Sequence, residues 1–162
     1  MGWPSILDRY RAAIDAELQA VLAAYPSPMQ PLLRYHLGWV DEHGNALPRP
    51  VGKALRPTLC LLACEAASGA YEQALPAAAA LELVHGASVI YDDIQDDDQE
   101  RRHRPTVWAV WGKRRALGAG TAMAGLALAR LADRGVPARK RLAAMHLWIG
   151  SCRDPGQHVR RG

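Results

Sequence analysis

The residues best suited to chemistry form an acidic cluster over residues 92–100, where six carboxylates fall within nine residues. Asp92 and Asp96 are four residues apart, which on a helix places both carboxylates on one face, about 6 Å apart along the axis. Mg²⁺ takes one or two protein carboxylates and completes its shell with water and phosphate oxygens. The pattern therefore indicates either a Mg²⁺ site or a solvated acidic helix end, neutralised by the basic residues 101–104 that follow.

Basic side chains suited to anion binding occur at two places. Lys53 and Arg56, within residues 52–57 (GKALRP), are three apart. We expect them to share the first turn of a helix, whose free N–H groups already favour anions. An ammonium group and a guanidinium fork together suit a diphosphate. Arg101 and Arg102, directly after the acidic cluster, form a second candidate anion site. At both places the alternative is that the side chains are simply solvated.

These residues are positioned by a succession of predicted helices, because apolar residues recur at spacings of three and four between proline-containing breaks. Helices are expected over residues 6–22, 31–40, 55–68, 76–96, 105–111, 116–134 and 138–149, with a loop over residues 41–51. The helix over 76–96 is nearly all apolar until its acidic end, which is typical of a helix enclosed by neighbours. Strand-like alternation of useful length does not occur. We predict one all-α bundle with short connections.

The composition agrees with a helical globular domain. The chain has 162 residues, of which 49% are apolar and 22% are charged, and it contains no Phe. Its three Cys residues, together with the lack of a basic-then-apolar N-terminal signal, indicate reduced thiols and a cytoplasmic protein. No uncharged run reaches the roughly 20 residues that a spanning helix needs; residues 116–129, for example, form a run of 14. We therefore expect no transmembrane segment.

Charge is unevenly distributed along the chain. Residues 1–129 hold 12 basic and 14 acidic side chains, whereas residues 130–162 hold 8 basic and 2 acidic ones. A basic tail can contact nucleic acid or a membrane surface. This tail lacks interleaved aromatic residues and any recognition motif, so we expect no nucleic-acid partner. We divide the chain into a helical domain over residues 1–150 and a divergent basic tail over residues 151–162.

Three short motifs stand in order along the chain: GKALRP at 52–57, ELVH at 82–85 with DDIQD at 92–96, and RRHRPT at 101–106. They resemble the GKxxRP, ELVH…DDxxD and RRxxPT motifs of the trans-isoprenyl diphosphate synthases, the polyprenyl synthetase family. The resemblance runs from about residue 4 to residue 149 and is densest over residues 50–112. It implies a helical bundle of the isoprenoid synthase type, here incomplete.

The resemblance also implies prenyl transfer, in which an allylic diphosphate condenses with isopentenyl diphosphate in a Mg²⁺-dependent reaction. By motif match, Asp92 and Asp96 ligate Mg²⁺ and Asp93 supports them as the third catalytic carboxylate. Arg101 contacts the allylic diphosphate. Isopentenyl diphosphate is held by Lys53, Arg56, His85 and Arg102. Ala87 and Ser88, five and four residues before Asp92, are small, which resembles enzymes that make geranylgeranyl or longer products.

The chain also departs from the family pattern. It has roughly half the family's usual length, it lacks the second aspartate-rich motif, and Thr121 stands where the family has Asp. With the basic tail, these departures predict a truncated or frame-shifted product. An incomplete bundle leaves an apolar face uncovered, so we expect a homodimer or other self-association. The alternative to an active enzyme is an inactive fragment that only binds Mg²⁺-diphosphate or associates with a full-length homologue.

Overall fold

The computed structural model describes residues 3–48, 52–132, 139, 142, 143 and 146. The basic tail over 151–162 lies outside these residues, and so does most of the helix expected over 138–149. The described elements are α1 (Trp3–Arg9), α2 (Arg11–Ala24), α3 (Gln30–His36), α4 (Leu55–Ser68), the 3₁₀ helix η1 (Glu72–Ala74), α5 (Leu75–Gln95), β1 (Glu100–Arg101), β2 (Arg104–Pro105), α6 (Val107–Trp111) and α7 (Lys113–Ala132). The predicted all-α class is confirmed.

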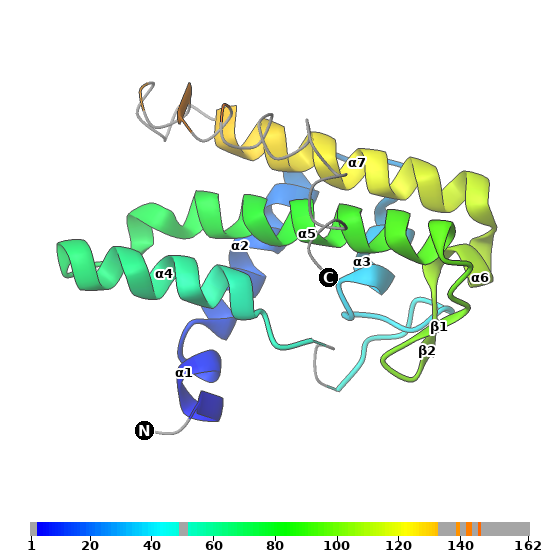
Figure 1. The fold of residues 1–162 in the computed structure, drawn as a ribbon, viewed down its shortest axis with the longest axis horizontal. Helices are drawn as coiled ribbons and strands as arrows, with labels where there is room; N and C mark the ends of the chain where they lie inside the picture. Colours follow the sequence, from blue (N-terminus) through cyan, green and yellow to red (C-terminus); the bar gives the residue numbers. More distant parts are fainter. Residues whose placement is uncertain (1–2, 49–51, 133–138, 140–141, 144–145, 147–162) are drawn as a thin grey trace, which may run out of the picture.

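Helix α5 forms the centre of the bundle. Figure 1 shows α7 running along one side of α5 and α4 along another, with α2 and α3 behind them. The buried face of α5 includes Ala79, Leu83 and Ile90, each with at most 1% of its surface exposed. These side chains pack with Leu61 of α4 and Met123 of α7 in a single core cluster. Burial of this apolar surface holds the three long helices together.

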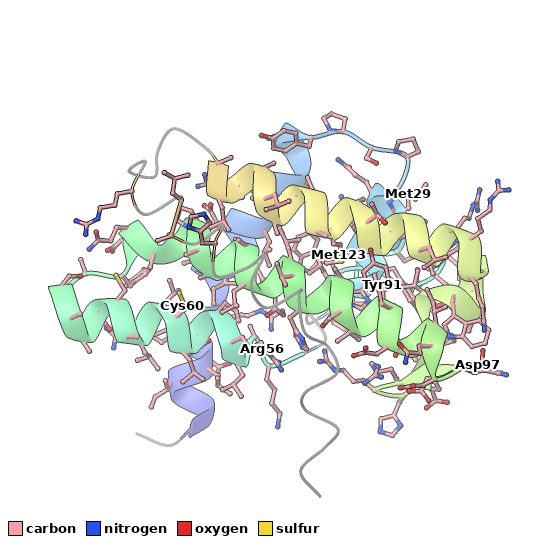
Figure 2. All side chains as sticks on the ribbon, turned by 45° about the horizontal axis from the view of Figure 1, so that its top comes forward. Met29, Arg56, Cys60, Tyr91, Asp97 and Met123 are labelled. Atoms are coloured by element: carbon pink, nitrogen blue, oxygen red, sulfur yellow. The ribbon has the colours of Figure 1, made fainter. Side chains whose placement is uncertain are left out.

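Small residues allow α5 and α7 to approach closely. A Cβ atom placed on Gly120 of α7 would lie 2.7 Å from the Tyr91 ring of α5. A Cβ atom placed on Gly86 of α5 would lie 2.5 Å from the terminal methyl group of Met123. Tyr91 and Met123 lie between the two helices in Figure 2. The alanine- and glycine-rich sequences of α5 and α7 thus allow the two helices to pack at a short separation.

The stretch Glu72–Gln95, which spans η1 and α5, would qualify as a membrane span by length and composition alone. Its mean hydropathy is 1.4, and 39% of its 18-residue apolar part is buried. The stretch runs through the middle of the bundle between α4 and α7 (Figure 1) and ends in the acidic cluster. Packing inside the bundle accounts for its buried apolar residues, whereas Leu81 remains 42% exposed.

The first predicted helix is not continuous, so that prediction is wrong in one respect. The helix is interrupted at Tyr10, which separates α1 from α2. Tyr10 is fully buried, and its hydroxyl donates a hydrogen bond to Glu65 of α4. Its ring meets the Tyr71 ring edge to face at a centroid distance of 5.0 Å. Apolar periodicity continues across the break, so the pattern alone could not reveal it.

Other boundaries also differ from the sequence prediction; α7, for example, begins at Lys113 instead of residue 116. Helix α3 ends at His36 rather than near Val40, because Val40 pairs with Ala46 in an isolated antiparallel bridge across the predicted loop. Pro105 belongs to β2 instead of opening a helix, and α6 begins at Val107 after Thr106. The strands of this hairpin are two residues long, too short to show an alternating pattern.

Candidate active site

The acidic end of α5 presents two exposed carboxylates. Asp92 lies in the last turn of the helix, and Asp96 is the residue after its end, with its N–H donating to the Asp92 carbonyl oxygen at 2.8 Å. Both side chains are exposed, and neither forms a hydrogen bond or an ion pair within the described residues. The next residue, Asp97, has φ 55°, in the left-handed region, so the chain does not continue the helix. Its side chain pairs with Lys113 of α7.

Asp93 has quite different surroundings, since only 2% of its surface is exposed. The Arg101 Nε atom donates to Asp93 Oδ1 at 2.5 Å, and an Arg101 terminal nitrogen lies 3.3 Å from Asp98 Oδ2. Burial raises the pKa of Asp93, and the hydrogen bond from Arg101 opposes that rise. Asp93 therefore anchors the β1–β2 hairpin to α5, and Arg101 is engaged by two carboxylates.

The hairpin carries Arg102 at its tip. Arg102 and His103 form a two-residue turn with φ values of 54° and 60°, the left-handed geometry that matches the twist of paired strands. Thr106 closes the hairpin, because its N–H donates to the Gln99 carbonyl oxygen at 2.9 Å. Arg102 reaches Gly52, where an added Cβ atom would lie 2.6 Å from the guanidinium Nη1. The fold thus joins two motifs fifty residues apart in the sequence.

A basic pocket lies between α3, α5 and the hairpin. Its acidic, basic and histidine lining residues are His36, Glu82, His85, Asp93, Arg101, Arg102 and Arg104. His85 Nε2 is 3.0 Å from Arg56 Nη1 at the first turn of α4. Because Arg56 can only donate, His85 accepts this bond in its neutral form, and burial and the Arg56 charge both lower its pKa. Figure 2 shows Arg56 at the start of α4.

Lys53 and Arg56 do not share a helical turn, so that prediction is wrong. Helix α4 begins at Leu55, and Ala54 before it has φ 45°, in the left-handed region. Lys53 therefore precedes the helix and is exposed, as is Arg56. Contact between Gly52 and Arg102 nevertheless places the Lys53 segment beside the hairpin tip.

Comparison with known proteins decides the family. The polyprenyl synthetase family model matches residues 38–153, which include the GKALRP and RRHRPT motifs and the acidic end of α5. This chain is a polyprenyl synthetase family member. The family resemblance read from the three motifs is thereby confirmed.

Individual polyprenyl synthetase relatives agree with this assignment. The chain is 50% identical over 105 residues to the (2E,6E)-farnesyl diphosphate synthase of Mycobacterium tuberculosis H37Rv, covering 65% of this chain and 29% of that protein. It is 34% identical over 157 residues to the geranylgeranyl diphosphate synthase of the same organism, covering 93% and 45% respectively. The chain thus spans less than half the length of these curated relatives.

Solved structures of polyprenyl synthetases have the same fold over the matched part. A polyprenyl synthetase from Streptomyces coelicolor A3(2) superposes with a TM-score of 0.76 at 36% identity, covering 96% of this chain and 48% of that one. A geranylgeranyl pyrophosphate synthetase from the archaeon Geoglobus acetivorans gives a TM-score of 0.76 at 28% identity, covering 91% and 45%. The chain corresponds to about half the length of each structure.

The acidic end of α5 fits a Mg²⁺ ion shared with a diphosphate, and does not fit an ion held by protein alone. Within the ranges that the structure describes, no group of three or more Asp, Glu, His or Cys side chains could hold a metal. Asp92 and Asp96 instead offer two exposed carboxylates one turn apart. Mg²⁺ commonly uses one or two protein carboxylates and takes its remaining ligands from water and substrate phosphates.

Sequence reasoning assigned no role to three pocket residues: His36, Glu82 and Arg104. Arg104 lies over the Tyr35 ring at 4.2 Å and donates to the Val40 carbonyl oxygen at 2.7 Å, which ties the hairpin to the α3 end of the pocket. Glu82 belongs to the ELVH motif, so a signal for it existed. His36 had no such signal, because only the folded chain brings α3 beside α5.

Proposed function

We propose that this chain forms the diphosphate-binding part of a Mg²⁺-dependent trans-prenyltransferase. Such an enzyme condenses an allylic diphosphate with isopentenyl diphosphate and extends it to a geranylgeranyl-like or longer product. The observation that carries the proposal is that two exposed carboxylates, Asp92 and Asp96, have no hydrogen-bond or ion-pair partner among the described residues. They lie at the end of a helix whose preceding turns border a basic pocket. The farnesyl and geranylgeranyl diphosphate synthases among the relatives support the same reaction class.

The residues present divide into two roles. Asp92 and Asp96 would hold Mg²⁺ against the allylic diphosphate, where the ion supplies a Lewis acid that neutralises the departing diphosphate. Arg56, Arg102 and the neutral His85 would bind isopentenyl diphosphate, with Lys53 approaching from the segment before α4. Arg101 would contact the allylic diphosphate while Asp93 orients it.

Product length is proposed from the side chains preceding Asp92. Ser88 is exposed four residues before Asp92, whereas Ala87 is 4% exposed and packs in the core. A growing prenyl chain would therefore meet the small Ser88 side chain, which leaves room for a geranylgeranyl-like or longer product. We further propose that the protein acts in the cytoplasm as a homodimer.

The direct test is titration of Mg²⁺ with inorganic pyrophosphate by calorimetry, comparing the parent chain with Asp92→Asn and Asp8→Asn. Asp8 is an exposed carboxylate on α1, so its substitution changes the net charge equally without touching the acidic cluster. We expect Asp92→Asn to weaken Mg²⁺-dependent pyrophosphate binding roughly tenfold or more, since a charged ligand is lost, and Asp8→Asn to leave it unchanged. Equal binding by both variants would refute the proposed site.

A second candidate function is an inactive chain that only binds Mg²⁺-diphosphate or associates with a longer homologue. Exposed leucines on α4, α5 and α7 favour it, because Leu59, Leu81 and Leu117 leave 47%, 42% and 47% of their surfaces uncovered. An assay with allylic diphosphate, isopentenyl diphosphate and Mg²⁺ separates the two. Elongated product establishes the enzyme, and binding without product establishes the second candidate.

A further inference from the structure

Arg11 of α2, which lies outside the basic pocket, holds the segment that carries Lys53. The Arg11 Nη1 atom donates to the Gly52 carbonyl oxygen at 2.7 Å. The same guanidinium uses Nε to donate to Asp15 Oδ2 at 2.6 Å, and Trp39 Nε1 lies 3.4 Å from the other Asp15 oxygen. Both charged side chains are largely buried, with 22% of Arg11 and 17% of Asp15 exposed. Asp15 therefore holds the Arg11 guanidinium in the orientation in which it binds Gly52.

The backbone of this segment needs such a restraint. Gly52 has φ 109° and Ala54 has φ 45°, and a residue with a Cβ atom adopts the left-handed region only at an energetic cost. Ala54 precedes the first residue of α4 and provides no side-chain cap. Lys53 lies between these two positions, so the direction of its side chain depends on both of them.

Gly52 is also the point where the segment meets Arg102. Because the Arg102 guanidinium occupies the space of a Cβ atom at Gly52, the positions of Gly52 and Arg102 depend on each other. Glu82 borders both the basic pocket and the smaller cavity lined by Arg11 and Asp15. Burial raises the pKa of Glu82, and the charges of Arg102, Arg11 and Arg56 oppose that rise. Arg11 itself does not line the basic pocket; it reaches the pocket through its hydrogen bond to Gly52 and through its charge near Glu82.

We infer that Arg11 is a positioning residue for diphosphate binding, which holds the Gly52 carbonyl and so fixes Lys53 and Arg102 in their binding positions. The inference rests on the proposed function of the basic pocket. Arg11 lies outside all three motifs and does not line the pocket.

The test compares Arg11→Gln and Arg11→Lys with Arg9→Gln. Arg9 lies two residues before Arg11, at the end of α1, and pairs with Glu65 of α4, so its substitution removes an ion pair between helices but leaves Gly52 bound. The first measurement is the initial rate of trypsin cleavage after Lys53, relative to cleavage after Lys113, followed by mass spectrometry. We expect a roughly tenfold relative increase in Arg11→Gln, the factor for losing one charge-assisted hydrogen bond, a smaller increase in Arg11→Lys, and none in Arg9→Gln.

The second measurement is the affinity for inorganic pyrophosphate in the presence of Mg²⁺. We expect roughly tenfold weaker binding in Arg11→Gln, partial rescue in Arg11→Lys and parent-like binding in Arg9→Gln. If the parent binds pyrophosphate and Arg11→Gln binds it equally well, the inference is overturned. A parent that binds no pyrophosphate refutes the proposed function instead, and the cleavage rates then still decide whether Arg11 holds the segment. Should Arg11→Gln fail to fold, the comparison of Arg11→Lys with the parent decides both measurements.

Discussion

Three aspartates near the end of α5 differ in their surroundings. Asp92 and Asp96 face solvent, whereas Asp93 is 2% exposed and bonded to Arg101. The spacing of Asp92 and Asp96 predicted that they share one face of the helix end, and the structure leaves both side chains exposed. The partner of Asp93 could not be predicted, because the hairpin that brings Arg101 back to α5 depends on two consecutive residues with positive φ, Arg102 and His103.

A pH-dependent loss of stability is expected from His36. Burial, and then the nearby charges of Arg102, His85, Arg101 and Arg104, lower the pKa of His36 from 6.5 to about 4. The folded chain therefore favours the neutral His36 ring. The stability that this preference contributes is fully present above pH 6.5 and is lost as the pH falls towards 4. Because the His36 residue is half-buried and not fully enclosed, we expect a loss of about 1–2 kcal/mol between about pH 8 and pH 5.

The measurement is the free energy of unfolding in urea as a function of pH, for the parent chain and for His36→Gln. Because His85 also titrates with a lowered pKa, only the difference between the two curves reports on His36. The parent should lose more stability on acidification than the variant. Parallel curves would show that His36 is not the responsible group.

At the scale of elements, the sequence predicted the long helices well. Helix α4 ends at Ser68 with Gly69 in the left-handed conformation, and α5 spans Leu75–Gln95, close to the expected ranges. Long apolar periodicity and glycine or proline at the ends determine such helices locally. The break at Tyr10 and the short hairpin depend on tertiary partners, so local patterns did not reveal them.

The close packing of α5 against α7 leads to a prediction with an internal control. Gly120→Ala would place a Cβ atom 2.7 Å from the Tyr91 ring, whereas Gly125 on the same helix has no atom within 4 Å of the added Cβ. We expect Gly120→Ala to lower the free energy of unfolding by about 1–2 kcal/mol through overpacking. Gly125→Ala should raise it by about 0.5–1 kcal/mol, because alanine favours the helix.

Chemical denaturation followed by circular dichroism measures both variants in the same host. If Gly120→Ala were as stable as Gly125→Ala, the described contact between Tyr91 and α7 would not restrict the separation of the helices.

At the scale of the whole molecule, the described part of the chain leaves large apolar side chains uncovered on its long helices. Leu55, Leu59, Leu81 and Leu117 are each between 42% and 47% exposed. We expect the purified chain to sediment as a dimer or larger species, because exposed large apolar side chains on these helices favour association. The triple variant Leu59→Gln, Leu81→Gln and Leu117→Gln should shift the distribution towards monomer in analytical ultracentrifugation.

Tyr25→Gln is the matched control for this experiment. Tyr25 is 48% exposed, but it lies at the C-terminal end of α2, away from the three leucines in sequence and element. Its substitution should leave the sedimentation profile unchanged. A monomeric parent chain would contradict the expected association.

The sequence by itself determined the helical class, the acidic end of α5 and the three motifs that assign the family, because each depends on local spacing or short-range order. Only the tertiary structure decided which side chains meet: Arg101 with Asp93, Arg102 with Gly52, and Arg56 with His85. These contacts join residues from separate elements, and they form only when packing of the apolar helix faces brings those elements together.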